Sequence, residues 1–353
     1  IGGILIYLAI KKDMEPSLLL PIGFGAIMVN LPLSGAVTQI QDGIKEIGVL
    51  DVLFDAGIAN ELFPLILFVG IGAMIDFTPL LTNPKLMIFG AAAQFGIFFT
   101  LCMATLLGFN LNDAASIAII GAADGPTSIF VANFLKSDYI GAIIVVAYSY
   151  MALVPIVQPP VIKLMTSKKE RRIRMEPSTK QVSKTTKILF PIIITMVAGL
   201  VAPKSVSLIG FLMFGNLIRE CGVLNNLSET AQKVLANLVT LFLGITVATK
   251  MQAAQFLSLE TLMILALGLF AFVFDTVGGV LIAKLFNLFS KKKINPMIGA
   301  AGISAFPMSA RVVHKMGLEE DKQNFLLMHA AGVNVSGQIA SVIAGGLILK
   351  LFG

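Results

Sequence analysis

Long apolar stretches, each near the length of a membrane-spanning helix, alternate with short polar connections along the 353-residue chain. A helix that crosses a bilayer needs roughly 20 predominantly apolar residues. The pattern predicts membrane segments at residues 1–10, 18–33, 62–76, 86–108, 140–162, 188–202, 206–218, 235–249, 259–285 and 323–350. We therefore expect an all-α polytopic membrane protein.

Two further apolar stretches, 114–135 and 296–313, are interrupted by polar and helix-breaking residues. The first contains IIGAADGPTSIF at residues 119–130, in which Asp124 precedes a Gly-Pro pair. A carboxylate is expensive in lipid, and Pro breaks a helix. The backbone groups freed by such a break must find partners in protein, water or an ion. The stretch is therefore expected to do something other than cross the bilayer.

Three pairs of similar strings occur in the same order in the two halves of the chain. IGFGAIM (22–28) resembles IGFLMFG (209–215), LFVGIGAM (67–74) resembles LFLGITVA (241–248), and IGAADGPTS (120–128) resembles IGAAGISAF (298–306). Short apolar strings recur by chance, but their shared order predicts an internal duplication.

Charge predicts how the halves are oriented. Only 13% of residues are charged, and residues 163–187 hold nine Lys and Arg against two Glu. In an apolar chain such a run indicates a cytoplasmic loop, not a nucleic-acid site. Placing this loop, Lys11–Lys12 and Lys291–Lys293 inside requires the stretch 114–135 to turn back, and it places the acidic residues 34–60 outside. If the stretch 296–313 also turns back, each element of the second half runs opposite to its counterpart in the first.

The predicted fold is therefore an inverted repeat, an architecture common among secondary transporters. The first repeat covers residues 1–165, a basic cytoplasmic linker covers 166–187, and the inverted second repeat covers 188–353. Two broken re-entrant helical segments are expected to meet near the bilayer midplane.

Oxygen ligands cluster at the first break. Asp124, Thr127 and Ser128, with the exposed carbonyls, suit a hard cation such as Na⁺, because one carboxylate neutralises it in a low-dielectric site. The alternative is a proline kink with Asp124 paired to Arg311. Asn334 and Ser336 are the expected partners from the second half, although small residues there also suit helix packing.

Four motifs carry a resemblance that extends over almost the whole chain. They are GAADGPTSIF (121–130), AYSYMALVPIVQPP (147–160), NPMIGAAGISAFPMSARV (295–312) and GVNVSGQIAS (332–341). Together they resemble the beta subunit of the sodium-pumping biotin-dependent decarboxylases, which act on oxaloacetate, methylmalonyl-CoA, glutaconyl-CoA or malonate.

The resemblance implies a carboxybiotin decarboxylase that consumes a proton and exports Na⁺ across the cytoplasmic (inner) membrane. It implies that carboxybiotin is presented by a biotin carrier subunit and loaded by a carboxyltransferase alpha subunit. A small membrane-anchored gamma or delta subunit and a homo-oligomeric assembly are expected as well. Which acid or acyl-CoA feeds the complex is left open.

The resemblance also implies roles for single residues. The family's intramembrane aspartate falls on Asp124, and its asparagine in the last segment falls on Asn334. Its catalytic or biotin-binding set falls on Tyr150, Asn295, Gly299, Ser304 and Arg311. Ser304 is also a candidate metal ligand. Tyr150 either donates the proton to biotin or hydrogen-bonds the Na⁺ site.

Simpler interpretations stay open for several of these residues. Tyr150 also suits an interfacial anchor, and Arg311 a snorkelling cytoplasmic residue. Asp275 is either a coupling residue or a helix-pairing residue. Apart from the resemblance, a secondary Na⁺/carboxylate symporter on the same scaffold would rank first. A mere anchoring subunit leaves Asp124, Arg311 and Asn334 unexplained.

Overall fold

The computed structural model describes residues 1–353 except 14, 42, 177–180 and 254–257. Among the described residues, six helical stretches are long and apolar enough to cross a membrane, and a bent pair (49–59 with 62–74, 61° apart) would make a seventh. The six are Pro84–Leu106, Ile140–Met165, Lys184–Val201, Asn225–Lys250, Leu259–Phe289 and Leu327–Phe352. The all-α, multi-pass prediction is confirmed.

The helices of the first half closely follow the predicted segments. They are α1 (Gly2–Lys12), α2 (Pro16–Val29), α3 (Val49–Phe54), η1 (Asp55–Ala59), α4 (Leu62–Met74), α5 (Thr78–Thr82), η2 (Pro84–Leu86), α6 (Met87–Ala92), α7 (Phe95–Leu106), α8 (Leu111–Ala118), η3 (Ile119–Ala122), α9 (Gly125–Phe134) and α10 (Ile140–Met165).

The second half continues with a short helix and further long ones. They are α11 (Lys168–Arg171), α12 (Lys184–Val201), η4 (Pro203–Ser205), α13 (Val206–Cys221), α14 (Asn225–Thr230), η5 (Ala231–Leu235), α15 (Ala236–Val247), η6 (Ala248–Lys250), α17 (Leu259–Phe289), η7 (Pro296–Gly302), α18 (Met308–Glu320) and α19 (Leu327–Phe352).

Helices from the two halves pack against each other in a crossed pattern. α2 packs against α15, and α4 packs against α13. Glycines allow these close approaches: a Cβ on Gly25 would lie 2.9 Å from the Ile245 carbonyl oxygen, and one on Gly215 would lie 2.1 Å from that of Val69. α10 likewise contacts α18, and α19 contacts α9. The halves therefore interlock.

The first broken segment (residues 110–138) begins and ends at one place. Asn110 caps α8 by accepting a 2.9 Å hydrogen bond from the Asp113 N–H. Asp113 in turn accepts hydrogen bonds from the Ser137 hydroxyl (2.6 Å) and the Asp138 N–H (3.0 Å), beyond the end of α9. Hydrogen bonds thus hold the start of α8 next to the end of α9, so the segment begins and ends at the same place.

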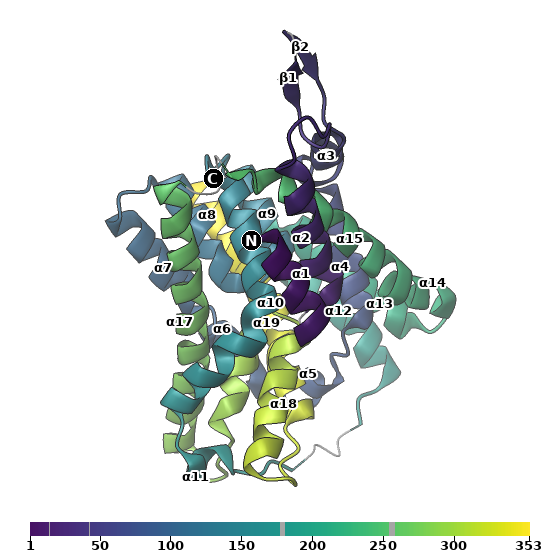
Figure 1. The fold of residues 1–353 in the computed structure, drawn as a ribbon. Helices are drawn as coiled ribbons and strands as arrows, with labels where there is room; N and C mark the ends of the chain where they lie inside the picture. Colours follow the sequence, from purple (N-terminus) through teal and green to yellow (C-terminus); the bar gives the residue numbers. More distant parts are fainter. Residues whose placement is uncertain (14, 42, 177–180, 254–257) are drawn as a thin grey trace.

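The second broken segment (residues 295–324) has the same property. The side-chain amides of Asn295, before η7, and Asn324, after α18, both donate to the backbone carbonyl of Arg171, at 2.8 and 2.9 Å. α8 and α9 lie toward one end of the molecule, whereas α11 and α18 lie toward the other (Figure 1). The joined ends of the first segment therefore lie toward one end of the protein, and those of the second segment lie toward the other.

Residues 34–60 contain regular secondary structure. They form an antiparallel pair, β1 (Gln39–Gln41) and β2 (Ile44–Glu46), followed by α3 and η1. The strands project from the helical body at the end opposite α11 (Figure 1). The acidic connection and the basic linker are thus at opposite ends. Residues 177–180 of the predicted linker lie outside the described residues.

Candidate functional site

The tips of the two broken segments touch deep inside the protein. The Ser304 N–H donates a 3.2 Å hydrogen bond to the carbonyl of Ala122. Ala122 ends the first arm of one segment, and Ser304 lies in the unwound stretch of the other. Both residues are buried. This backbone contact joins two points that lie 182 positions apart in the chain, and it forms the centre of the candidate site.

Asp124 lies at the first break, directly before α9, and is buried. The preceding residue, Ala123, has a left-handed φ of 55°, a backbone conformation that costs conformational energy in a non-glycine residue. Asp124 Oδ2 accepts a 2.6 Å hydrogen bond from the Thr127 hydroxyl, and the Asp124 carbonyl accepts one of 2.9 Å from Ser128. The positive end of α9 also favours a negative charge here.

α19 runs past both tips and contacts each of them. Asn334 Nδ2 donates to the carbonyls of Ala301 (3.1 Å) and Ile303 (2.6 Å) in the second segment. Seven positions later, the Ser341 hydroxyl lies 3.5 Å from Asp124 Oδ2 in the first segment. The structure therefore brings together five residues predicted from the sequence: Asp124, Thr127, Ser128, Ser304 and Asn334.

Two other predicted ligands are occupied elsewhere. The Ser336 hydroxyl donates to the carbonyls of Leu86 (3.1 Å) and Val333 (2.6 Å), which places it against the junction of η2 and α6. Asn295 donates to Arg171 and Ile173 and accepts from the Met297 N–H, so all its polar atoms have partners. Both side chains are therefore hydrogen-bonded within the protein.

The two tyrosines of α10 face different surroundings. The Tyr150 hydroxyl donates a 2.7 Å hydrogen bond to the Leu265 carbonyl, and its ring packs beside Phe272, both on α17. Tyr148 instead lies against Gly125, where a Cβ would approach its ring to 2.4 Å. The Tyr148 hydroxyl is buried and has no hydrogen-bond partner among the described residues. Tyr148 is thus the tyrosine beside the Asp124 break.

Gly299 serves close packing of the second segment. A Cβ at this position would lie 2.1 Å from the Gly279 carbonyl oxygen of α17. On the other side, a Cβ on Gly337 of α19 would lie 2.1 Å from the Gly302 carbonyl oxygen. The backbone of the second segment therefore packs directly against the backbones of α17 and α19. A side chain at Gly299 or Gly337 would prevent this close packing.

Arg311 projects from α18 and is exposed. Its guanidinium acts electrostatically on Glu15, in the turn between α1 and α2, although burial outweighs this and raises the pKa of Glu15. Within the described chain, no ion pair joins Arg311 to Asp124, so the alternative of a kink stabilised by that pair is wrong.

Asp275 of α17 stabilises a break in a neighbouring span. Its Oδ1 accepts a 2.6 Å hydrogen bond from the Gly96 N–H, where α7 begins after α6 has ended. The other oxygen, Oδ2, has no hydrogen-bond partner among the residues described, and a Cβ on Gly121 would lie 3.0 Å from it. Asp275 therefore connects α17, the α6–α7 break and the first segment.

Sequence reasoning missed Tyr148, Gln338 and Ser341. Gln338 donates to the Ser304 carbonyl and is buried. A signal was present for two of them: Gln338 and Ser341 follow Asn334 by four and seven positions, which places all three on one face of a helix. Tyr148 could not be told from Tyr150 without knowing which way α10 is rotated.

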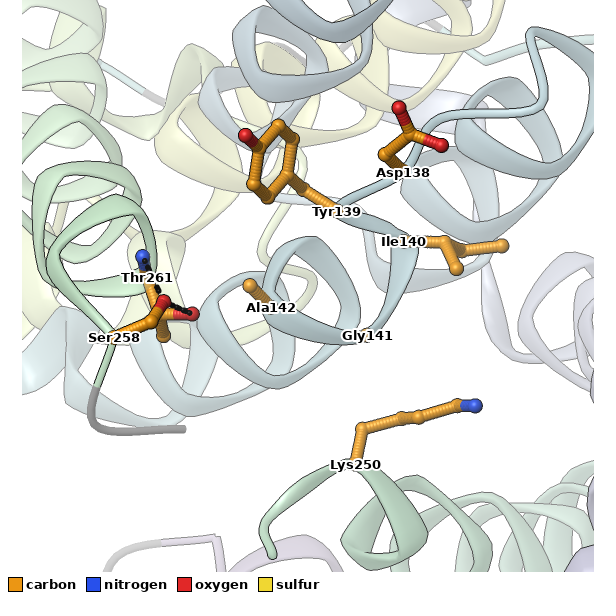
Figure 2. A pocket seen from close by; sticks show the side chains of 8 residues that line it. All are labelled: Asp138, Tyr139, Ile140, Gly141, Ala142, Lys250, Ser258 and Thr261. Carbon is orange, nitrogen blue, oxygen red and sulfur yellow. Dashed lines mark hydrogen bonds between the residues drawn. The ribbon is translucent and has the colours of Figure 1, made fainter. Parts of the chain in front are cut away.

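An open pocket lies near the joined ends of the first segment, apart from the tips. Its volume is about 340 Å³, and its lining residues come from the start of α10 with the two residues before it, the end of η6, and the start of α17 (Figure 2). Asp138 and Lys250 are its charged residues. A neighbouring pocket contains Asp113, Asp138 and Glu260. Two pockets therefore lie beside the joined ends of the first segment.

The chemistry of the tip region suits a small hard cation. It contains one buried carboxylate, hydroxyls, backbone carbonyls and amide oxygens, and no cationic side chain hydrogen-bonds Asp124 among the described residues. A buried carboxylate without a counter-charge is costly, and a bound cation would remove that cost.

The chain was also compared with known proteins. Residues 1–352 match the model of the family described as the Na⁺-transporting oxaloacetate decarboxylase beta subunit. The methylmalonyl-CoA decarboxylase subunit beta of Veillonella parvula is 50% identical over 351 residues, which cover 99% of this chain and 91% of the relative.

Two further relatives are similarly close. The glutaconyl-CoA decarboxylase subunit beta of Acidaminococcus fermentans is 49% identical over 353 residues, covering 100% of this chain and 92% of its own length. The oxaloacetate decarboxylase beta chain 2 of Salmonella typhimurium is 46% identical over 401 positions, covering 98% of this chain and 92% of the relative.

Proposed function

Because the chain belongs to the family of the Na⁺-transporting oxaloacetate decarboxylase beta subunit, we propose that Na⁺ crosses it at the contact between the two broken segments. The chain is a decarboxylase beta subunit that couples decarboxylation of carboxybiotin to Na⁺ export. The observation that carries the proposed route is the hydrogen bond between Ser304 and Ala122, two residues before Asp124.

We propose an inverted repeat for the whole molecule, with residues 1–165 and 188–353 as the two repeats and 166–187 as a cytoplasmic linker. The crossed contacts of α2 with α15 and of α4 with α13 support it, because each helix packs against the counterpart of its neighbour. The joined ends of each broken segment support re-entrant hairpins that enter from opposite sides.

The proposed Na⁺ site consists of the Asp124 carboxylate with oxygens from Thr127, Ser128, Ser304 and Asn334. The carboxylate neutralises the ion, which lowers the cost of holding it in a low-dielectric site. Because the ligands come from both hairpins and from α19, a small rocking of one half against the other would open the site to either side.

Decarboxylation breaks the bond between a biotin ureido nitrogen and the carboxyl carbon, releases CO₂, and leaves the nitrogen to take up one proton. We propose that Arg311 holds the carboxylate of carboxybiotin, because guanidinium binds such groups in a bidentate manner. Tyr150 and Tyr148 are the candidate proton donors, and the unpartnered hydroxyl of Tyr148 favours the latter.

Coupling requires that CO₂ release waits for Na⁺. Moving one charge against 100 mV costs about 2.3 kcal/mol, which would be lost if the reaction ran with an empty site. In this proposal, Na⁺ binding completes the tip contact and thereby sets the geometry of the second segment, which carries Arg311.

Partners follow from the family. We propose a biotin carrier, a carboxyltransferase alpha subunit and a small membrane-anchored subunit, in a homo-oligomeric complex of the inner membrane. Relatives of nearly equal identity carry names that refer to methylmalonyl-CoA, glutaconyl-CoA and oxaloacetate. We therefore propose that another subunit, and not the beta chain, selects the acid or acyl-CoA that is decarboxylated.

The test is Na⁺ uptake by proteoliposomes that contain the assembled decarboxylase complex. Uptake should require the acid or acyl-CoA substrate of the complex, and it should stop when avidin binds the biotin. Asp124→Asn keeps the shape but removes the charge, and it should lower uptake by a factor of about 100 or more, since a buried ion loses its counter-charge. Normal uptake by this variant would exclude Asp124 from the ion path.

A further inference from the structure

Two buried side-chain amides on one face of α19 have an unused oxygen each. Asn334 and Gln338 are 0% and 3% exposed. Their NH₂ groups donate to the carbonyls of the unwound stretch of the second segment: Asn334 to Ala301 and Ile303, and Gln338 to Ser304. The amide oxygens, Asn334 Oδ1 and Gln338 Oε1, have no hydrogen-bond partner among the described residues.

Gln94 and Gln158 also have a buried amide oxygen without a partner among the described residues, so the position of Gln338 at the tip contact distinguishes it. A buried acceptor without a partner costs about 1–3 kcal/mol. An apolar side chain would avoid that cost, at the loss of one bond to the Ser304 carbonyl. A cation would use the free oxygen, because amide oxygens are ordinary ligands of hard cations.

The position of Gln338 connects this oxygen to the proposed ion site. Gln338 hydrogen-bonds Ser304, whose own N–H donates to Ala122 in the first segment. The Ser341 hydroxyl, almost one turn further along α19, donates to the Gln338 carbonyl (3.0 Å) and lies 3.5 Å from Asp124 Oδ2. The Gln338 amide therefore stands at the tip contact, on the face of α19 that reaches Asp124.

We propose that Gln338 Oε1 is a neutral ligand of the Na⁺ ion held by Asp124. The same amide would hold the Ser304 carbonyl through its nitrogen, so ion binding on one side of the amide orients the second segment on the other. Gln338 then acts as the link between ion occupancy and the hairpin that carries Arg311. This inference rests on the proposed function and adds a residue to it.

The experiment measures the Na⁺ concentration that gives half-maximal decarboxylation and Na⁺ uptake by the assembled complex in proteoliposomes. Gln338→Met keeps the length of the side chain but removes both polar atoms. We expect the half-saturating Na⁺ concentration to rise roughly tenfold, with a smaller change of the maximal rate.

Gln158→Met is the matched control. Gln158 is also buried, and its Nε2 donates a 2.8 Å hydrogen bond to the Ala300 carbonyl of the same segment, but from α10. Its loss removes a bond of the same kind and should leave the half-saturating Na⁺ concentration unchanged. Equal rises in both variants would mean that amide bonds merely stabilise the segment, and the proposal would be overturned.

Gln338→Glu keeps an oxygen and adds a charge, so it decides the matter even where the Met variant does not assemble. With its carboxyl ionised, this variant should bind Na⁺ at least as tightly as the unmodified complex. A half-saturating concentration raised tenfold would contradict a ligand role. Failure of the unmodified complex to take up Na⁺ would instead overturn the proposed function itself.

Discussion

Gly299 shows how a single residue can serve packing where sequence likeness suggests a biotin contact. Its α-carbon faces the Gly279 carbonyl, and an added methyl would lie 2.1 Å away. Gly299→Ala must push the second segment from α17, at a cost of about 1–3 kcal/mol or more. We expect a lower thermal unfolding midpoint of the purified complex.

The control for this prediction is Gly210→Ala in α13, where the nearest atom beyond the helix is Thr195 Cγ2, at 3.9 Å. That variant should be as stable as the unmodified complex. If Gly299→Ala keeps full stability yet loses decarboxylation, then its role is contact with carboxybiotin and the packing argument fails.

Residue-scale chemistry was only partly predictable. Asp124, Thr127 and Ser128 could be selected because polar groups at a helix break within an apolar chain need partners. The hydrogen-bond partners of Asn295 and Ser336 could not be predicted, because Arg171 and Leu86 are distant from them in the chain. Side-chain direction depends on helix rotation, which tertiary packing sets.

At the scale of elements, the breaks and most helix spans followed from the sequence, whereas the role of the linker did not. Arg171 in α11 is buried and forms a 2.6 Å ion pair with Glu320 at the end of α18. Its carbonyl also receives both ends of the second segment. A run of basic residues predicts a side of the membrane but not these contacts.

We predict that the pair of Arg171 and Glu320 fixes the second segment. Arg171→Met should destabilise the complex by about 1–3 kcal/mol, because it removes charge-assisted hydrogen bonds from a buried group. It should also lower the number of Na⁺ ions moved per CO₂ released, since the hairpin can move without its clamp. The double substitution Arg171→Glu with Glu320→Arg should restore part of both.

The exposed pair of Arg174 and Asp321 is the matched control, with a shortest contact of 2.6 Å and an Arg174 side chain that is 56% exposed. Its removal should change neither stability nor stoichiometry measurably. Hydrogen bonding to Arg171 lowers the pKa of Glu320. The contribution of the pair of Arg171 and Glu320 to the free energy of unfolding is therefore complete above the ordinary glutamate pKa, and it is lost as the pH falls through the lowered pKa. A stoichiometry that survives Arg171→Met would show that the linker is passive.

For the molecule as a whole, the crossed packing and the two joined hairpins make one topological prediction. The first hairpin should open to the outside at both ends, and the second should open to the cytoplasm at both ends. Single cysteines at Asn112 and Lys136 test the first, and single cysteines at Lys293 and Lys322 test the second, since all four positions are exposed.

The background for this labelling replaces Cys102 and Cys221, the two free cysteines of the chain. Reference cysteines at Lys45 and Lys12 mark the outside and the inside, because the acidic connection and the first basic pair carry the charge bias expected of those sides. A membrane-impermeant thiol reagent should label 112 and 136 together with 45 in sealed cells. Positions 293 and 322 should react with it only after permeabilisation, together with 12. If the two ends of either hairpin reacted from opposite sides, that segment would cross the bilayer. The repeats could then not be inverted, and the proposed ion site at Asp124 and Ser304 would not lie between two re-entrant hairpins.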